Sequence, residues 1–248
     1  MKTMIAFDLD GTLAASKQPL ADDMAATLKT LLDVAFVAVI SGGDWPQFEK
    51  QVASRLPEGT KLDRLFLMPT TGSKLYRHRD GAWDRIYAED FSRGEHDEIL
   101  AALRRAAKAC GYDTERTWGE QIEDRGSQIT FSALGQEAPL DAKEAWDPDQ
   151  KKRRAMQALI EKDLPGLSVK VGGSTSIDIT RAGVDKAWAI EKLCEHSGVA
   201  RDAILFMGDA IYPGGNDDPV RAAGIDSIKV RDPAETITAI SAVVACLK

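Results

Sequence analysis

The chain has 248 residues, which is enough for one large domain or two small ones. Hydrophobic residues make up 44% and charged residues 29%, a balance that is ordinary for a folded protein and excludes an intrinsically disordered chain. The net charge of -7 argues against a nucleic-acid partner. It does not exclude a phosphorylated small substrate, because a local cationic pocket is invisible in a net charge.

Cysteine usage and the N-terminus indicate a cytoplasmic protein. The three cysteines are Cys110, Cys194 and Cys246, and no CxxC pair occurs, so neither a zinc site nor a disulfide framework is indicated. This pattern suits a reducing compartment. The apolar run before Asp8 is too short for a signal peptide, and no stretch approaches the ~18 apolar residues of a membrane span. We therefore expect no membrane association.

Short apolar runs alternate with amphipathic helical patterns at both ends of the chain. Strands are expected at Met4–Phe7, Val34–Ile40, Leu65–Met68, Ile204–Met207 and Ser227–Val230. Helices are expected at Ala21–Leu32, Lys186–His196 and Pro233–Cys246. Strand, helix and strand at this spacing predict parallel βαβ units, and hence an α/β fold with a parallel sheet.

The middle of the chain has a different, α+β pattern. Helices are expected at Arg93–Cys110 and Gln150–Leu164, and strands at Gln128–Leu134, Ser168–Val171 and Ser176–Thr180. The last two strands are joined by Gly172-Gly173-Ser174. We interpret residues 79–183 as an inserted domain, and residues 1–78 and 184–248 as the core. Lys151-Lys152-Arg153-Arg154 is interpreted as a solvated helix face, with a supply of cations to the inserted domain as the alternative.

Three expected strands end in a polar residue followed by a turn. These turns begin with Asp8-Leu9-Asp10-Gly11-Thr12, Ser41-Gly42-Gly43-Asp44 and Gly208-Asp209. In an open parallel sheet, ligands bind at the carboxyl ends of the strands, so these polar groups are expected to meet in one crevice. Each one alone is a weak signal, because an Asp after a strand is often a helix N-cap, and only the three together indicate a common cause.

The pair of Asp8 and Asp10 indicates metal-assisted phosphoryl transfer. Two neighbouring carboxylates repel each other unless a cation lies between them or one holds a proton. Mg²⁺ suits oxygen ligands and substrate phosphate, and Asp209 and Asp217 add further carboxylates. Asp8 is then the nucleophile that forms an aspartyl-phosphate, and Asp10 is the general acid and base.

Two further features suit a phosphate group. Ser41 and Gly42 offer a hydroxyl and an accessible backbone N–H, although a plain Ser-Gly-Gly turn is an equal interpretation. Lys186 opens a helix and can neutralise phosphate charge, although a solvated helix lysine is the usual finding.

These motifs, in this order, resemble the four motifs of the haloacid dehalogenase superfamily. They are Asp8-Leu9-Asp10-Gly11-Thr12, Ser41-Gly42, Lys186, and Gly208-Asp209 with Asn216-Asp217. The long insertion between the second and third motifs resembles the α/β (C2B) cap of the subfamily IIB enzymes. The resemblance implies a Rossmann-like core, Mg²⁺, and phosphatase or phosphomutase chemistry. It also implies that Asp8, the carbonyl of Asp10 and Asp209 hold the metal.

A closer similarity is to the eukaryotic-type phosphomannomutases. It is carried by Ser41-Gly42-Gly43-Asp44, Gly172 to Asp178, Asp185-Lys186 and Gly208 to Asp217. In that family the residues that match Ser176 and Asp178 touch the sugar, and Arg125 matches a cap arginine that grips the non-reacting phosphate.

The chain departs from the mutases at three positions where they carry arginine. Gln136 and Lys143 stand at two of their cap arginines, and Lys17 stands at a core arginine. Lys143 and Arg125 stay candidate substrate contacts, but lysine and glutamine do not replace the bidentate arginine fork.

We therefore expect a Mg²⁺-dependent phosphatase of a small phosphorylated metabolite, a sugar phosphate, ahead of a phosphomannomutase-type hexose phosphate mutase. A non-catalytic sugar-phosphate-binding protein is the third alternative, and the presence of Asp8, Asp10, Lys186 and Asp209 argues against it. We expect a monomer, or a homodimer formed through the cap.

Overall fold

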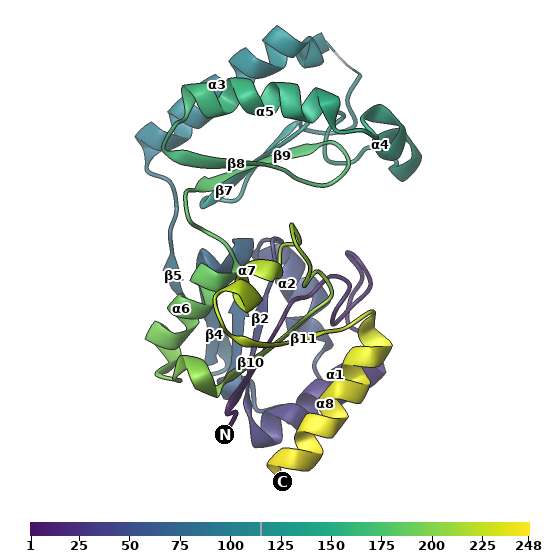
Figure 1. Cartoon of the computed structure of the whole chain (residues 1–248), viewed down its shortest axis with the longest axis vertical. Helices are drawn as coiled ribbons and strands as arrows, with labels where there is room; N and C mark the ends of the chain where they lie inside the picture. Colours follow the sequence, from purple (N-terminus) through teal and green to yellow (C-terminus); the bar gives the residue numbers. More distant parts are fainter. Residues whose placement is uncertain (115) are drawn as a thin grey trace. The chain divides into compact units, whose positions relative to one another are not determined.

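Strands from both ends of the chain form one seven-stranded sheet with apolar central strands, in the order β11-β10-β1-β2-β3-β4-β5 (Figure 1). The computed structural model describes residues 1–114 and 116–248. The strands from β11 to β3 are parallel, whereas β4 and β5 are antiparallel. Their bounds are β1 Met4–Phe7, β2 Phe36–Ile40, β3 Leu65–Met68, β4 Lys74–Arg79, β5 Ala82–Ala88, β10 Ile204–Gly208 and β11 Asp226–Lys229.

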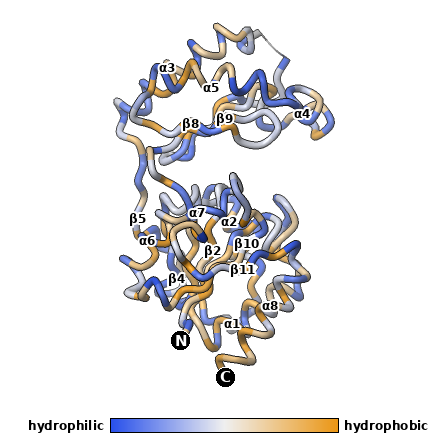
Figure 2. Tube along the Cα trace, in the orientation of Figure 1, coloured by the Kyte–Doolittle hydropathy of each residue, from blue (hydrophilic) through white to orange (hydrophobic). Residues whose placement is uncertain are grey.

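Helices cover both faces of this sheet, because the central strands are apolar at every position. On β1, Ile5 and Phe7 pack against α1 and α8, while Met4 and Ala6 face the opposite layer with α6. The hydrophobic colour in Figure 2 accordingly lies along the central strands of this sheet. The helices of this unit are α1 Asp22–Val34, α2 Trp45–Gln51, α6 Lys186–Ser197, α7 Asp218–Ala222 and α8 Pro233–Leu247.

Residues 89–184 form a second compact unit. Its antiparallel sheet has the order β6-β7-β9-β8. Apolar residues on one face of the sheet pack against α3 and α5. The helix α3 begins with a capping box between Ser92 and Glu95 and ends at Gly111 in the left-handed conformation. The bounds are α3 Arg93–Cys110, β6 Ile122–Asp124, β7 Gln128–Ser132, α4 Leu140–Trp146, α5 Lys151–Asp163, β8 Leu167–Val171 and β9 Ser176–Arg181.

The predicted class, an α/β core with an inserted α+β domain, is confirmed. The boundaries differ, because the core unit comprises residues 1–88 and 185–248 rather than 1–78 and 184–248. The reason is the β4–β5 hairpin, which extends the core sheet through residue 88. The interpretation of residues 151–154 as a solvated face is wrong for Arg153, which is 4% exposed and pairs with Asp147.

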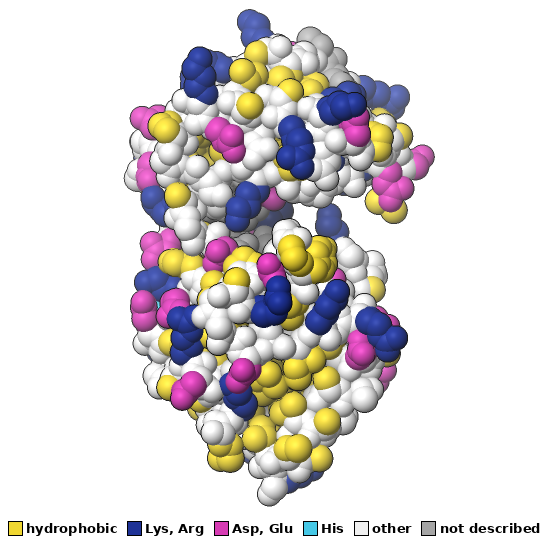
Figure 3. Space-filling view, in the orientation of Figure 1, with side chains coloured by type: hydrophobic (Ala, Val, Ile, Leu, Met, Phe, Trp, Pro, Cys, Tyr) yellow, Lys and Arg dark blue, Asp and Glu magenta, His cyan; other side chains and the backbone are white. Residues whose placement is uncertain are grey.

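The surface carries charges of both signs. On the face drawn in Figure 3, lysine and arginine side chains alternate with aspartate and glutamate over both units. Within residues 1–114 and 116–248, none of the helices combines the length and the apolar character that a membrane crossing requires.

Candidate active site

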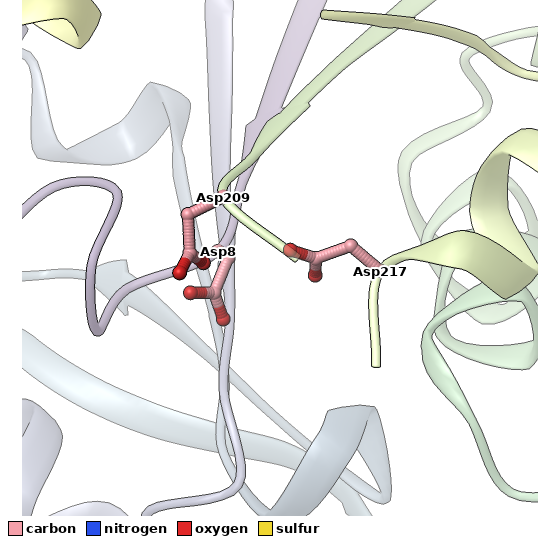
Figure 4. A group of neighbouring side chains, drawn as sticks. All are labelled: Asp8, Asp209 and Asp217. Carbon is pink, nitrogen blue, oxygen red and sulfur yellow. The ribbon is translucent and has the colours of Figure 1, made fainter. Parts of the chain in front are cut away.

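Three carboxylates gather at the carboxyl ends of neighbouring core strands. Asp8 follows β1 and Asp209 follows β10, which pairs with β1, while Asp217 lies at the start of α7. One oxygen of each lies within 4.8 Å of the others (Figure 4). Asp8 and Asp217 are buried, and Asp209 is partly exposed. The predicted convergence of these residues is therefore present in the structure.

Lys186 supplies the cation of this cluster. Its Nζ donates to Oδ1 of Asp8 and, at 2.5 Å, to Oδ1 of Asp217. It is the first residue of α6, and Asp185 caps that helix by accepting from the backbone N–H of Trp188. Burial lowers the pKa of Lys186, but the attraction of Asp8 and Asp217 outweighs it, so the pKa lies above its ordinary value. Lys186 therefore stays charged inside the protein.

The carboxyl group of Asp8 does not ionise as easily as an exposed one. Burial and the neighbouring charge of Asp217 raise its pKa to about 6, although Lys186 pulls in the opposite direction. The cluster contains three carboxylates, of which Asp8 and Asp217 are buried and Asp209 is partly exposed, but only one ammonium, that of Lys186. It thus carries excess negative charge when all its carboxylates are ionised. It therefore favours either a proton on Asp8 or an added cation.

The side chain of Asp10 lies outside the group of three carboxylates. Its Oδ1 accepts from the backbone N–H of Lys17 at 2.6 Å, and its Oδ2 accepts from Nε2 of Gln47 at 3.5 Å. Lys17 adopts φ 58° to place this N–H. The carboxylate of Asp10 is therefore held by Lys17 and Gln47, apart from the carboxylates of Asp8, Asp209 and Asp217.

Glycines make room for the carboxylates. A Cβ on Gly11, where φ is 88°, would lie 2.6 Å from Oδ2 of Asp209. A Cβ on Gly208 would lie 2.3 Å from Oδ2 of Asp217. The glycines of the two motifs are therefore required by the close approach of the acidic side chains.

The loop after β2 presents the predicted phosphate contacts. Ser41 is 4% exposed, and its carbonyl accepts from the backbone N–H of Thr71 at 2.8 Å. Gly42 is partly exposed. Asp44, at the N-cap of α2, forms an ion pair of 2.7 Å with buried Lys74 on β4. Sequence reasoning missed Lys74 because a lysine in a strand is usually exposed, and only the pairing of β4 with the core sheet buries it.

The predicted substrate residues of the inserted unit occupy different places. Ser176 and Asp178 lie on the polar face of β9, opposite the helix-covered face. Arg125 lies in the turn after β6 and binds Glu123 through two hydrogen bonds of 2.9 and 2.8 Å. Lys143 on α4 donates to the carbonyl of Gln136 at 2.9 Å. Ser176 and Asp178 therefore lie on one face of the same strand, whereas Arg125 and Lys143 form hydrogen bonds to other residues of the inserted unit.

The sequence model of the family described as haloacid dehalogenase-like hydrolase matches residues 5–212, and the chain belongs to this family of enzymes. Curated relatives include the phosphomannomutase of Schizosaccharomyces pombe, 25% identical over 87% of this chain and 84% of that protein. Human phosphomannomutase 1 is 25% identical over 87% of this chain and 82% of its own length. The predicted family and the predicted sequence similarity to phosphomannomutases are confirmed.

Solved structures show the same fold at lower identity. A trehalose-6-phosphate phosphatase of Aspergillus fumigatus has a TM-score of 0.60 and 18% identity, over 98% of this chain and 93% of that one. A truncated IMP-nucleotidase of Plasmodium falciparum has a TM-score of 0.69 and 15% identity, over 100% and 71%. These likenesses establish the architecture and not the substrate.

Proposed function

We propose that this chain is a Mg²⁺-dependent phosphatase that acts on a sugar phosphate through a phosphoryl group held covalently on Asp8. The observation that carries the proposal is the buried arrangement of Asp8 with Lys186, Asp217 and Asp209 at the carboxyl ends of parallel strands. In this class of sheet, that edge is where ligands bind.

The donor set fits a hard divalent cation. Asp8, Asp209 and Asp217 each offer a carboxylate oxygen, and these oxygens lie within 4.8 Å of one another, a spacing that suits ligands of one ion. Both oxygens of Asp217 already accept hydrogen bonds, from Lys186 and from the backbone N–H of Ala210. Asp8 and Asp209, with the carbonyl of Asp10, would therefore hold Mg²⁺, which would neutralise charge on the phosphoryl oxygens.

The residues of the chain divide the reaction into two steps. A carboxylate oxygen of Asp8 attacks phosphorus, the ester P–O bond breaks, and Asp10 gives its proton to the leaving oxygen. Asp10 then takes a proton from water, which attacks phosphorus and releases phosphate and free Asp8. Lys186 stays charged throughout and stabilises the phosphoryl oxygens and Asp8.

The charges of the inserted unit favour a phosphatase over a mutase. A mutase has to hold a second phosphate away from Asp8, which needs several cationic donors. The polar face of the β6-β7-β9-β8 sheet carries two carboxylates, Glu123 and Asp178, which are the cross-strand partners of Thr130 on either side. The lysine in register with them is exposed Lys170, opposite Asp178. Arg125 is already bound to Glu123, and Gln136 and Lys143 lack the arginine fork. A dianion on this face would meet repulsion.

A hexose phosphate mutase is the second candidate. The curated relatives named above are phosphomannomutases that match most of the chain. Exposed Lys170 is the cross-strand neighbour of Asp178 and is a cation that a second phosphate would use.

A panel of phosphomonoesters tests the proposal. Hexose 1-phosphates, hexose 6-phosphates and trehalose 6-phosphate are incubated with wild-type protein and with Asp8→Asn, with Mg²⁺ or with chelator. We expect phosphate release from at least one sugar phosphate, only with Mg²⁺ and only with Asp8 present. Release that persists in folded Asp8→Asn would contradict the role of Asp8.

A further inference from the structure

We infer that Thr130 and Gln128 are positioning residues that fix the carboxylate of Asp178 so that it recognises a sugar hydroxyl. The inference rests on the proposed function, because it concerns how the same substrate is selected. Neither residue belongs to a motif in the sequence, and both come from β7 rather than from the strand that carries Asp178.

The hydrogen bonds around Asp178 converge on one of its oxygens. Thr130 Oγ1 donates to Oδ1 of Asp178 at 2.7 Å, and Nε2 of Gln128 donates to the same oxygen at 3.2 Å. Nε2 of Gln128 also donates to Thr130 Oγ1 at 3.1 Å, which leaves the threonine hydroxyl hydrogen for Asp178. The direction of each bond in this network is therefore set.

The backbone register explains why these side chains meet. Thr130 lies directly opposite Asp178 in the antiparallel β7–β9 pair, and Gln128 lies opposite Thr180 on the same face. Thr130 and Gln128 are each 4% exposed. Buried positions on a sheet are usually filled by apolar side chains. Buried polar side chains such as Thr130 and Gln128 need hydrogen-bond partners, and Asp178 accepts a hydrogen bond from both.

The second oxygen of Asp178 is placed by a glycine. A Cβ added to Gly172, in the turn between β8 and β9, would lie 2.6 Å from Oδ2 of Asp178. Oδ1 of the carboxylate is thus held by two donors, and Oδ2 lies so close to Gly172 that a side chain at that position would displace it. A carboxylate with one saturated oxygen still accepts from a ligand hydroxyl, and it does so in one orientation.

Adjacent Ser176 extends the same surface. Its hydroxyl lies 3.0 Å from that of Ser132, which is again its cross-strand partner. The polar face of β7 and β9 is therefore lined by groups that exchange hydrogen bonds with hydroxyls. A polyol has hydroxyl hydrogens to donate to Asp178, whereas the nitrophenyl group of p-nitrophenyl phosphate has none.

The test compares kcat/KM for a hexose 1-phosphate with kcat/KM for p-nitrophenyl phosphate. Thr130→Val keeps the volume and removes the donor, and Thr130→Ser restores it. Gly172→Ala pushes on Oδ2 of Asp178, whereas Gly173→Ala is a matched control in the same turn, where a Cβ meets nothing within 4 Å. Circular dichroism and thermal unfolding verify that each variant folds.

We expect Thr130→Val and Gly172→Ala to lower the ratio of the two kcat/KM values about tenfold or more, mainly through a higher KM for the sugar phosphate. In Thr130→Ser the ratio should stay close to the wild-type value, and in Gly173→Ala it should equal the wild-type value. An unchanged ratio in both disruptive variants, or equal losses for the two substrates, would overturn the inference. If wild-type protein releases no phosphate from any sugar phosphate, the proposed function itself fails.

Discussion

Lys186 donates a hydrogen bond to Asp8 from a position where the two side chains are 2% and 6% exposed. An ammonium and a carboxylate this deeply buried are stable only as a pair, because either charge alone loses its hydration without compensation. Lys186 also serves Asp217, so one cation supports two buried carboxylates. The pairing links the folding of the core to its chemistry.

Lys186→Met is expected to lower kcat at least a hundredfold and to destabilise the fold by about 3–5 kcal/mol, because Asp8 and Asp217 lose their cation. Mg²⁺ should recover part of the stability. Lys192→Met is the matched control, since Lys192 forms a more exposed ion pair with Glu195 on the same helix. Thermal unfolding with and without Mg²⁺ measures the effect. Equal losses of kcat and of thermal stability in Lys186→Met and Lys192→Met would contradict the role of Lys186 as the cation of Asp8 and Asp217.

The pKa of Asp8 predicts a pH effect on metal-free protein. Because its folded pKa is about 6, against an ordinary 3.8, the folded state binds a proton that the unfolded state does not hold between these values. The contribution of protonated Asp8 to the free energy of unfolding is thus present below pH ~4. It is lost as the pH rises through about 6, which lowers the free energy of unfolding by roughly 3 kcal/mol.

Urea unfolding in chelator at pH 4 and pH 7 measures this effect. The free energy of unfolding of wild-type protein relative to Asp8→Asn should fall across this interval, and Mg²⁺ at pH 7 should reverse the fall. A difference that stays constant with pH would show that Asp8 is not perturbed.

Gly11→Ala is expected to raise the Mg²⁺ concentration for half-maximal activity about tenfold, because the added Cβ would lie 2.6 Å from Oδ2 of Asp209. The variant also carries the strain of alanine at φ 88°, roughly 1 kcal/mol. Gly81→Ala has the same strain at φ 84° without a neighbour within 4 Å, and so serves as the control. A Mg²⁺ requirement that is the same in both variants would count against the role of Asp209.

Gln47 is expected to assist Asp10 as the general acid. Gln47→Leu removes the donor to Oδ2 of Asp10, a long bond of 3.5 Å, so the loss in kcat/KM for a sugar phosphate should be about threefold to tenfold. The loss for p-nitrophenyl phosphate should be smaller, because its leaving group needs no proton. Asp10→Asn should show the same selectivity at greater magnitude. Exposed Glu49→Ala on the same helix is the control, and equal losses for both substrates would refute the role.

The local sequence pattern was sufficient to predict several helices and strands, including the strand that leads to Asp8. The strands β1 and β3 and the helix α3 have the predicted bounds, because their apolar runs or capping residues are visible in the sequence. Asp8, Asp209, Asp217 and Lys186 converge as predicted, since parallel strands bring their carboxyl ends to one edge. The hairpin of β4 and β5 was missed because its charged residues at Arg77 and Arg79 hide a pairing that depends on the sheet edge.

Other contacts depend on the pairing of strands that are distant in the sequence, and these contacts could not be predicted from the sequence. Lys74 meets Asp44 only because β4 returns beside β3, and Thr130 meets Asp178 only through the register of β7 and β9. Arg153 belongs to a basic run, yet its guanidinium is buried between Asp147 and the carbonyls of Gly172 and Gly173. A run of charge alone does not distinguish a solvated face from an internal ion pair.

The ratio of phosphate released to hexose 6-phosphate formed distinguishes a phosphatase from a mutase. Wild-type protein is supplied with a hexose 1-phosphate, Mg²⁺ and a catalytic amount of hexose bisphosphate, and both products are followed over time. We expect more free phosphate than hexose 6-phosphate, because the carboxylates of Glu123 and Asp178 repel a second phosphate, and Gln136 and Lys143 lack the arginine fork that would hold it. Hexose 6-phosphate as the main product would contradict the proposed phosphatase and identify a mutase.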